Sequence, residues 1–204
     1  MTRVRIHFAK RGYACFISHL DLPMLFSRAA RRAGLVPELT QGFSPHQRLA
    51  LCHPLPVGTV GANEPADFWF AEWGEGSLEK WRKSLPVGID ITDARLPADG
   101  DASLNKLCTA ALYAFEPLAG ADTGAIADIL ASALRENGAF LASSVTPGAA
   151  EIASCDLERS GLSFMVKSLV KSGAVSGWGD VAITRMAIGS WNEEAGRVIS
   201  LTEG

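Results

Sequence analysis

The sequence lacks the motifs that mark the common nucleotide-binding and hydrolytic enzymes. It contains no GxxxxGK[ST] phosphate loop, no GxGxxG turn, no GxSxG nucleophile elbow and no HExxH zinc motif. Its four cysteines are widely spaced and include no C-x-x-C pair, so neither an iron–sulfur cluster nor a zinc finger is indicated. We therefore expect the chain to bind no cofactor and no metal of its own.

Long apolar runs are also missing. No uninterrupted apolar segment could span a bilayer, and residues 1–6 begin a strand-like alternation without the apolar core of a signal peptide. We expect a cytoplasmic protein without membrane contacts, whose cysteines are reduced and mainly buried. The 204 residues, 48% hydrophobic and 20% charged, suffice for one large domain or two small ones.

Positive charge is concentrated near the N-terminus. Residues 1–50 contain eight Lys and Arg side chains against two Asp and Glu, a net charge of +6. The rest of the chain contains eleven against twenty, which gives −9 there and −3 overall. This asymmetry favours a basic face directed at an anionic partner, carried on an acidic body.

Hydrophobic periodicity predicts an α+β fold. Residues 1–97 read as strand, helix, strand, strand, helix, strand, the βαββαβ order of ferredoxin-like folds. The first strand should have a basic outer face, because Arg3, Arg5 and His7 alternate with apolar residues. The helix that follows should end at Gly34.

Residues 102–204 predict a second, more acidic and degenerate βαββαβ half, so that the whole chain forms tandem ferredoxin-like halves. Residues 123–137 have the apolar stripe of a helix. We expect a strand at 162–170, where alternate residues are apolar, and either a helix or a strand at 181–188.

The start of the first helix contains the first candidate chemical group. His19 and Asp21 could act as a general base and its orienting carboxylate. A structural alternative is favoured, in which Ser18 and Asp21 form a capping box, or Asp21 alone is the N-cap with Pro23 in the first turn.

The histidines could alternatively join cysteines in a metal site. His46 and His53 flank a predicted strand and could meet His19, Cys15 and Cys52 if the loop folds back, although their spacing matches no zinc signature. The other interpretation makes the cysteines core residues and the histidines structural.

The most unusual stretch is the loop Gln41–His46, in which Gly42, Phe43, Ser44 and Pro45 precede the imidazole of His46. Such a loop can stack on a base and hydrogen-bond its edge. It could equally be a tight connection with Phe43 in the core.

Arginines surround this loop in the sequence. Arg28, Arg31 and Arg32 share a helix face, and Arg48 follows nearby. Guanidinium groups at this spacing suit phosphates, although an isolated charged face is more often simply solvated.

Together these blocks resemble a bacterial radical SAM-associated domain of unknown function. The segments that carry the resemblance are Val4–Lys10, Phe16–Leu22, Arg28–Leu35, Gln41–His46, Pro54–Gly58 and Leu85–Ile89. The family's motif positions correspond here to Ser18, His19, Asp21, Gly42, Phe43, Pro45 and His46. The resemblance implies a domain joined to, or encoded beside, a radical SAM enzyme, with RNA modification as the expected context.

The chain departs from this family in two places. Pro23 interrupts the helix start, and in the second half Glu151–Asp156 stands where the family has a basic run before an acidic residue, which argues against RNA contacts there. There is also no C-x₃-C-x-x-C motif, so the chain cannot hold the radical SAM cluster itself.

The leading hypothesis is an accessory or substrate-recognition module that presents RNA to a radical SAM enzyme. Phosphates would contact Arg28, Arg31, Arg32 and Arg48, while the Gln41–His46 loop with Ser18 would complete the binding surface. One alternative is an independent RNA nuclease or modifying enzyme that uses His19 or His46. Another is a protein–protein adaptor that docks the partner through the acidic second half.

Overall fold

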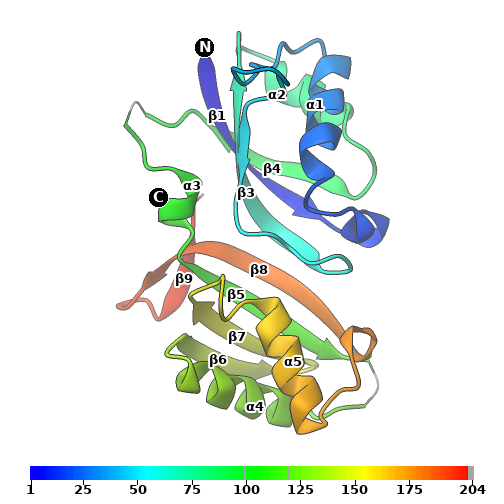
Figure 1. Ribbon diagram of the computed structural model, residues 1–204, viewed down its shortest axis with the longest axis vertical. Coiled ribbons are helices and arrows are strands. Elements are labelled where there is room, and N and C mark those ends of the chain that lie inside the picture. Colours follow the sequence, from blue (N-terminus) through cyan, green and yellow to red (C-terminus); the bar gives the residue numbers. More distant parts are fainter. Residues whose placement is uncertain (99, 119, 202–204) are drawn as a thin grey trace.

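A nine-stranded, mostly antiparallel sheet connects the two ends of the molecule in the computed structural model, which describes residues 1–98, 100–118 and 120–201 (Figure 1). The strands are β1 (Thr2–Lys10), β2 (Leu49–Leu51), β3 (Val60–Phe70), β4 (Ile89–Arg95), β5 (Ala110–Pro117), β6 (Phe140–Thr146), β7 (Ala149–Cys155), β8 (Val181–Asn192) and β9 (Arg197–Ser200). The helices are α1 (Leu22–Arg32), α2 (Ser77–Lys83), α3 (Leu104–Leu107), α4 (Thr123–Glu136) and α5 (Leu162–Ser172), with 3₁₀ turns η1 (Gly12–Phe16) and η2 (Trp178–Asp180). The predicted α+β class is confirmed.

The order of strands is the same in the two parts of the sheet. In the first part β1 lies between β4 and β3, antiparallel to both, and β2 pairs with β3. In the second part β5 lies between β8 and β7, and β6 pairs with β7. The parts meet where β3 and β8 run parallel, through Val60 opposite Thr184 and Gly61 opposite Arg185.

One aromatic core lies between the first part of the sheet and its helices α1 and α2. Phe26 of α1 packs 5.0 Å from Phe8 and 5.1 Å from Phe68, measured between ring centroids. Trp81 of α2 lies 4.9 Å from Phe68 in an edge-on arrangement. The helical spacing of apolar residues in α1 therefore positions the whole helix, because its buried stripe can face only this core.

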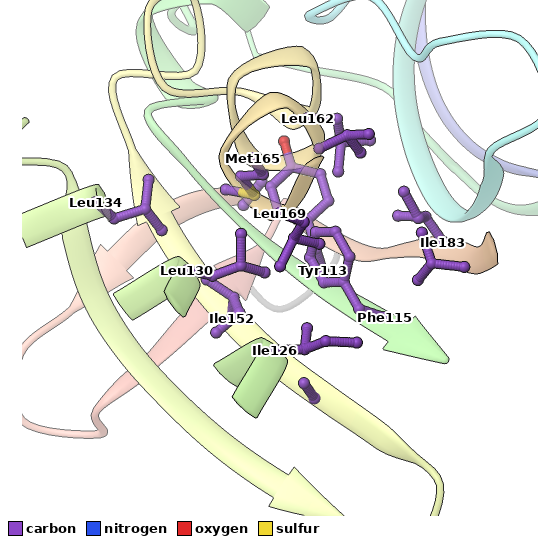
Figure 2. Packing of buried hydrophobic residues seen from close by; sticks show 14 of the residues in the cluster. Tyr113, Phe115, Ile126, Leu130, Leu134, Ile152, Leu162, Met165, Leu169 and Ile183 are labelled. Carbon is purple, nitrogen blue, oxygen red and sulfur yellow. The ribbon is translucent and has the colours of Figure 1, made fainter. Parts of the chain in front are cut away.

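A second core fills the space between α4, α5 and the other part of the sheet (Figure 2). The strand predicted at 162–170 is wrong, because this segment forms α5. Its buried residues Leu162, Met165, Val166 and Leu169 follow the i, i+3, i+4, i+7 spacing of a helix face. The undecided segment at 181–188 belongs to strand β8.

The predicted basic outer face of β1 is also wrong. Arg5 and His7 are fully buried, because β1 is a central strand with both faces covered. The Arg5 guanidinium donates to both carboxylate oxygens of Asp67, at 2.7 and 3.0 Å, and to the carbonyl of Ala102 at 3.1 Å. Arg3 binds the same carboxylate and is only partly exposed. The segment that leads to α3 thus covers the charged side of β1 (Figure 1).

A buried ion pair joins the two parts of the sheet. Arg185 of β8 donates through Nε to Glu64 of β3 at 2.9 Å and through a terminal nitrogen to the second oxygen of that carboxylate. The same guanidinium donates to the carbonyl of His53 at 2.8 Å. Burial by itself would lower the pKa of Arg185. The charge and hydrogen bonds of Glu64 have the larger effect, so the pKa of Arg185 lies above its ordinary value.

Removing the carboxylate should therefore destabilise the protein strongly. We expect Glu64→Gln to lower the free energy of unfolding by about 3–5 kcal/mol, because Arg185 would remain charged and buried without compensation. Urea denaturation measures this. The control Glu79→Gln removes a surface partner of Arg82 and should cost less than about 1 kcal/mol. Equal effects from the two variants would contradict the structure.

His7 should make stability depend on pH. Burial lowers its pKa from the ordinary 6.5 to about 4, against the opposing attraction of Asp93. Between these values the unfolded chain binds a proton that the folded protein does not, so stability should fall as pH is lowered through this window. The difference in unfolding free energy between wild type and His7→Leu should change by up to about 1.4 kcal/mol per pH unit there. A difference that stays constant from pH 6.5 to 4 would disprove this assignment.

Candidate functional site

The start of α1 follows the second of the two predicted arrangements. Asp21 occupies the N-cap position and Pro23 lies in the first turn, where its missing N–H costs little. Asp21 makes no capping hydrogen bond with its side chain. Instead, Ser18 Oγ donates to Asp21 Oδ2 at 2.6 Å. The two polar residues therefore bind each other at the surface and not the helix backbone.

The loop Gln41–His46 projects from a narrow, hydrogen-bonded base. Its stem is closed by Thr40 N donating to the carbonyl of His46 at 2.8 Å and by a bridge between Leu39 and Gln47. His46 Nδ1 lies 3.2 Å from both Thr40 Oγ1 and the carbonyl of Ser44, which orients its ring. The ring of Phe43 is fully exposed, at 111% of the reference area. Of the two interpretations of this loop, the structure shows the one with an exposed aromatic ring.

A groove of about 340 Å³ lies between α1 and this loop. Its lining residues are Leu20, Pro23, Met24, Ser27, Arg28, Arg31, His46 and Gln47. Arg28 and Arg31 are exposed and form no ion pair with any carboxylate in the described part of the chain. Two guanidinium groups and an imidazole thus face one recess, which suits an anionic ligand with a planar group.

The other two predicted arginines lie outside this groove. Arg32 donates to the carbonyl of Ser84 at 2.6 Å, which ties α1 to the end of α2. Arg48 lies over the indole of Trp69 of β3, and its Cζ is 4.6 Å from the ring centroid. Of the four arginines predicted to contact phosphates, only Arg28 and Arg31 therefore line this groove.

The predicted catalytic candidates do not share one cavity. His19 lines a small cavity at the junction of the two parts, together with Lys10, Glu64 and Arg185. Burial, and then the charge of Arg185, lowers the pKa of His19. Asp21 and His46 line different surface recesses.

The metal alternative finds no support in the geometry. Within residues 1–98, 100–118 and 120–201, no three His, Cys, Asp or Glu side chains gather in a way that could hold a metal ion. All four cysteines are free, and Cys15, Cys52 and Cys108 are buried.

A larger groove, of about 780 Å³, was missed by sequence reasoning. It lies at the junction, between the turn around Pro54 and the start of α5, and Tyr113 and Arg185 line it. Lys167 on α5 contributes a charged side chain to its wall. No local pattern could have found it, because its two walls come from segments about a hundred residues apart.

The fold and the groove together define an α+β protein with a basic recess on its first part. A family model of an uncharacterized protein conserved in bacteria (DUF2344) matches residues 3–158, and the chain belongs to that family. No curated protein matches the chain.

Among solved structures, a microcompartment protein from Desulfitobacterium hafniense DCB is similar over 96% of this chain and 98% of its own. The identity is 10% and the TM-score 0.26, so this likeness carries no argument about fold or function. Within the described residues, no helix is both long and apolar enough to cross a membrane.

The exposure of Phe43 can be tested by substitution. Phe43→Ala should change the free energy of unfolding by less than about 0.5 kcal/mol, because the ring contacts almost nothing. Phe26→Ala, the matched change in the aromatic core, should cost about 3–5 kcal/mol. Chemical denaturation of both variants distinguishes them, and a large loss with Phe43→Ala would mean that the ring is packed.

Proposed function

We propose that the protein is a non-catalytic accessory module that presents RNA to a radical SAM enzyme. The observation that carries this proposal is the groove between α1 and the Gln41–His46 loop, where Arg28, Arg31 and His46 line one recess, and the same loop carries the exposed ring of Phe43. A recess with two guanidinium groups, together with a loop that carries an exposed aromatic ring, suits a nucleotide better than it suits a purely apolar ligand.

Arg28 and Arg31 are the phosphate contacts in this proposal. They are three positions apart on α1, so their side chains project from the same helix face. The net charge of +6 over residues 1–50 favours the approach of a polyanion to this part of the molecule. Arg32 and Arg48 have other partners and are not needed in the recess.

The loop supplies the contacts to a base. Phe43 offers an open ring face for stacking, and the neighbouring His46 offers an imidazole nitrogen to a base edge. Stacking of this kind needs an unpaired base, so we propose that the module binds single-stranded or looped RNA and not a continuous duplex.

The partner enzyme and the architecture complete the proposal. A radical SAM partner is supported by the resemblance of the motif segments alone, and the absent C-x₃-C-x-x-C motif means that the partner would supply the cluster. We also propose that both parts are ferredoxin-like, the second as complete as the first. The order β8-β5-β7-β6 supports this, because it repeats β4-β1-β3-β2.

RNA titrations at several salt concentrations test the proposal. Wild-type protein should bind a single-stranded oligoribonucleotide with an affinity that falls as salt rises. The double variant Arg28→Ala/Arg31→Ala should bind more weakly, and the slope of log K against log salt should become shallower by about 0.7 for each phosphate that is no longer neutralised. Phe43→Ala should cost about 1–3 kcal/mol of binding free energy, because the base would have no ring to stack on.

Arg135→Ala is the matched control, because this arginine lies in the second part, over the ring of Phe140. It should leave the salt slope unchanged. No RNA binding by the wild type, or binding that is insensitive to salt, would exclude the RNA-presenting role.

A further inference from the structure

The sheet ends in two outer strands of equal length whose free edges are protected to different degrees. β4 ends the first part and β6 ends the second (Figure 1), and each has seven residues. The free edge of a strand presents unpaired N–H and C=O groups that can pair with another chain, so most proteins cover or charge such an edge. A long edge without protection therefore indicates a contact surface.

The edge of β4 is protected in two ways. Arg82 of α2 donates to the carbonyls of Ile91 and Thr92 at 2.9 and 3.1 Å, so a side chain of the same molecule already occupies backbone acceptors of this strand. The strand also contains three charged residues, Asp90, Asp93 and Arg95. The other strands that pair on one side only, β2 and β9, have just three and four residues.

β6 has none of these protections. It contains no charged residue and no proline, and Val145 is 54% exposed. Its polar side chains bind β7: Ser144 Oγ donates to Glu151 at 3.1 Å, and Thr146 Oγ1 donates to the carbonyl of Ala149 at 3.3 Å. In the described part of the chain no strand pairs with the outer side of β6. A register irregularity lies at its start, and residues 142–146 are regular.

The register of β6 shows which backbone groups are free. Thr146 lies opposite Ala149, so the loop to β7 has only two residues. The pair that closes such a loop is hydrogen-bonded, and hydrogen-bonded pairs then alternate with non-hydrogen-bonded pairs along the strands. The backbone of Ser144 is thus directed to β7, while the N–H and C=O groups of Ser143 and Val145 point outwards.

We propose that β6 pairs with β6 of a second copy of this chain, antiparallel and about a two-fold axis at Ser144, so that two sheets become one. Ser143 of each copy then lies opposite Val145 of the other, and these pairs exchange about four backbone hydrogen bonds. Ser144 lies opposite Ser144 of the second copy in a non-hydrogen-bonded pair.

Self-complementarity and closure favour a second copy as the occupant. Two identical antiparallel strands offer each other the same groups, so the free groups on both are satisfied. Because β6 carries no charge, the two-fold pair brings no like charges opposite each other on the strands. A head-to-tail contact of β6 with β4 would build a filament, but Arg82 and the charges of β4 oppose it. Pairing therefore stops at a dimer.

Sedimentation of the full chain over a range of concentrations tests this inference. The wild type should show a monomer–dimer equilibrium. Val145→Pro should raise the dissociation constant at least about tenfold, because each copy loses an outward N–H donor. The monomer should stay folded in urea denaturation, because proline is tolerated on an edge strand where the N–H faces solvent. The control Val145→Thr keeps the N–H and should dimerise like the wild type.

Cross-linking tests the register without a proline. The background variant Cys155→Ser removes the one cysteine that is not buried. In it, Ser144→Cys should form a disulfide-linked dimer with oxidised glutathione, because residues opposite each other in a non-hydrogen-bonded pair have Cα atoms about 4.5 Å apart. Ser190→Cys, at an exposed position of β8, is the control and should remain monomeric.

Several results would overturn the inference. These are a wild type that stays monomeric up to millimolar concentration, a Val145→Pro variant that dimerises like the wild type, and cross-linking at position 190 that equals that at position 144. Open-ended assembly in place of a dimer would also overturn it. The groove beside α1 takes no part in this pairing, so loss of the RNA proposal would leave the dimer unaffected.

Discussion

The arrangement of the whole molecule depends on one buried ion pair, Glu64 with Arg185. The sheet is continuous across the junction through only two residue pairs of β3 and β8 in the described part of the chain, so hydrogen bonding between these strands gives little cohesion. The Arg185 guanidinium also donates to the carbonyls of His53 and Pro54. These hydrogen bonds hold the turn that forms one wall of the larger groove. The pair therefore sets both the relation of the two parts and the shape of the space between them.

The basic recess and the junction cavity lie in different places in this protein. The recess between α1 and the Gln41–His46 loop is open and basic, and the loop carries the exposed ring of Phe43. The junction cavity is small and holds His19 beside Lys10 and the central ion pair. One conspicuous motif segment thus contains both an exposed loop and His19, which lines the junction cavity.

Local patterns in the sequence predicted some features well and others badly, for physical reasons. The stripe of α1 follows from residues close together in the chain, whereas the local sequence left open whether Phe43 is exposed or buried. The burial of Arg5 could not be predicted, because its partner Asp67 lies about sixty residues away, and that of His7 depends on β1 being a central strand of the sheet. Segment 162–172 satisfied a two-residue alternation and a helical period at once, and only packing against α4 and the sheet decides between them. Arg32 and Arg48 do not line the groove beside α1, because Arg32 donates to Ser84 and Arg48 lies over Trp69. Both partners are distant in the chain, so this too could not be predicted.

The small number of residue pairs between β3 and β8 does not make the two parts independent. Cys52 and Leu55 belong to the first part of the chain, but they pack in the hydrophobic core of the second part. Opening the junction would therefore expose these two side chains to water as well as break the Glu64–Arg185 pair. Native-state hydrogen exchange should show the amides at the seam opening only together with the core of the second part.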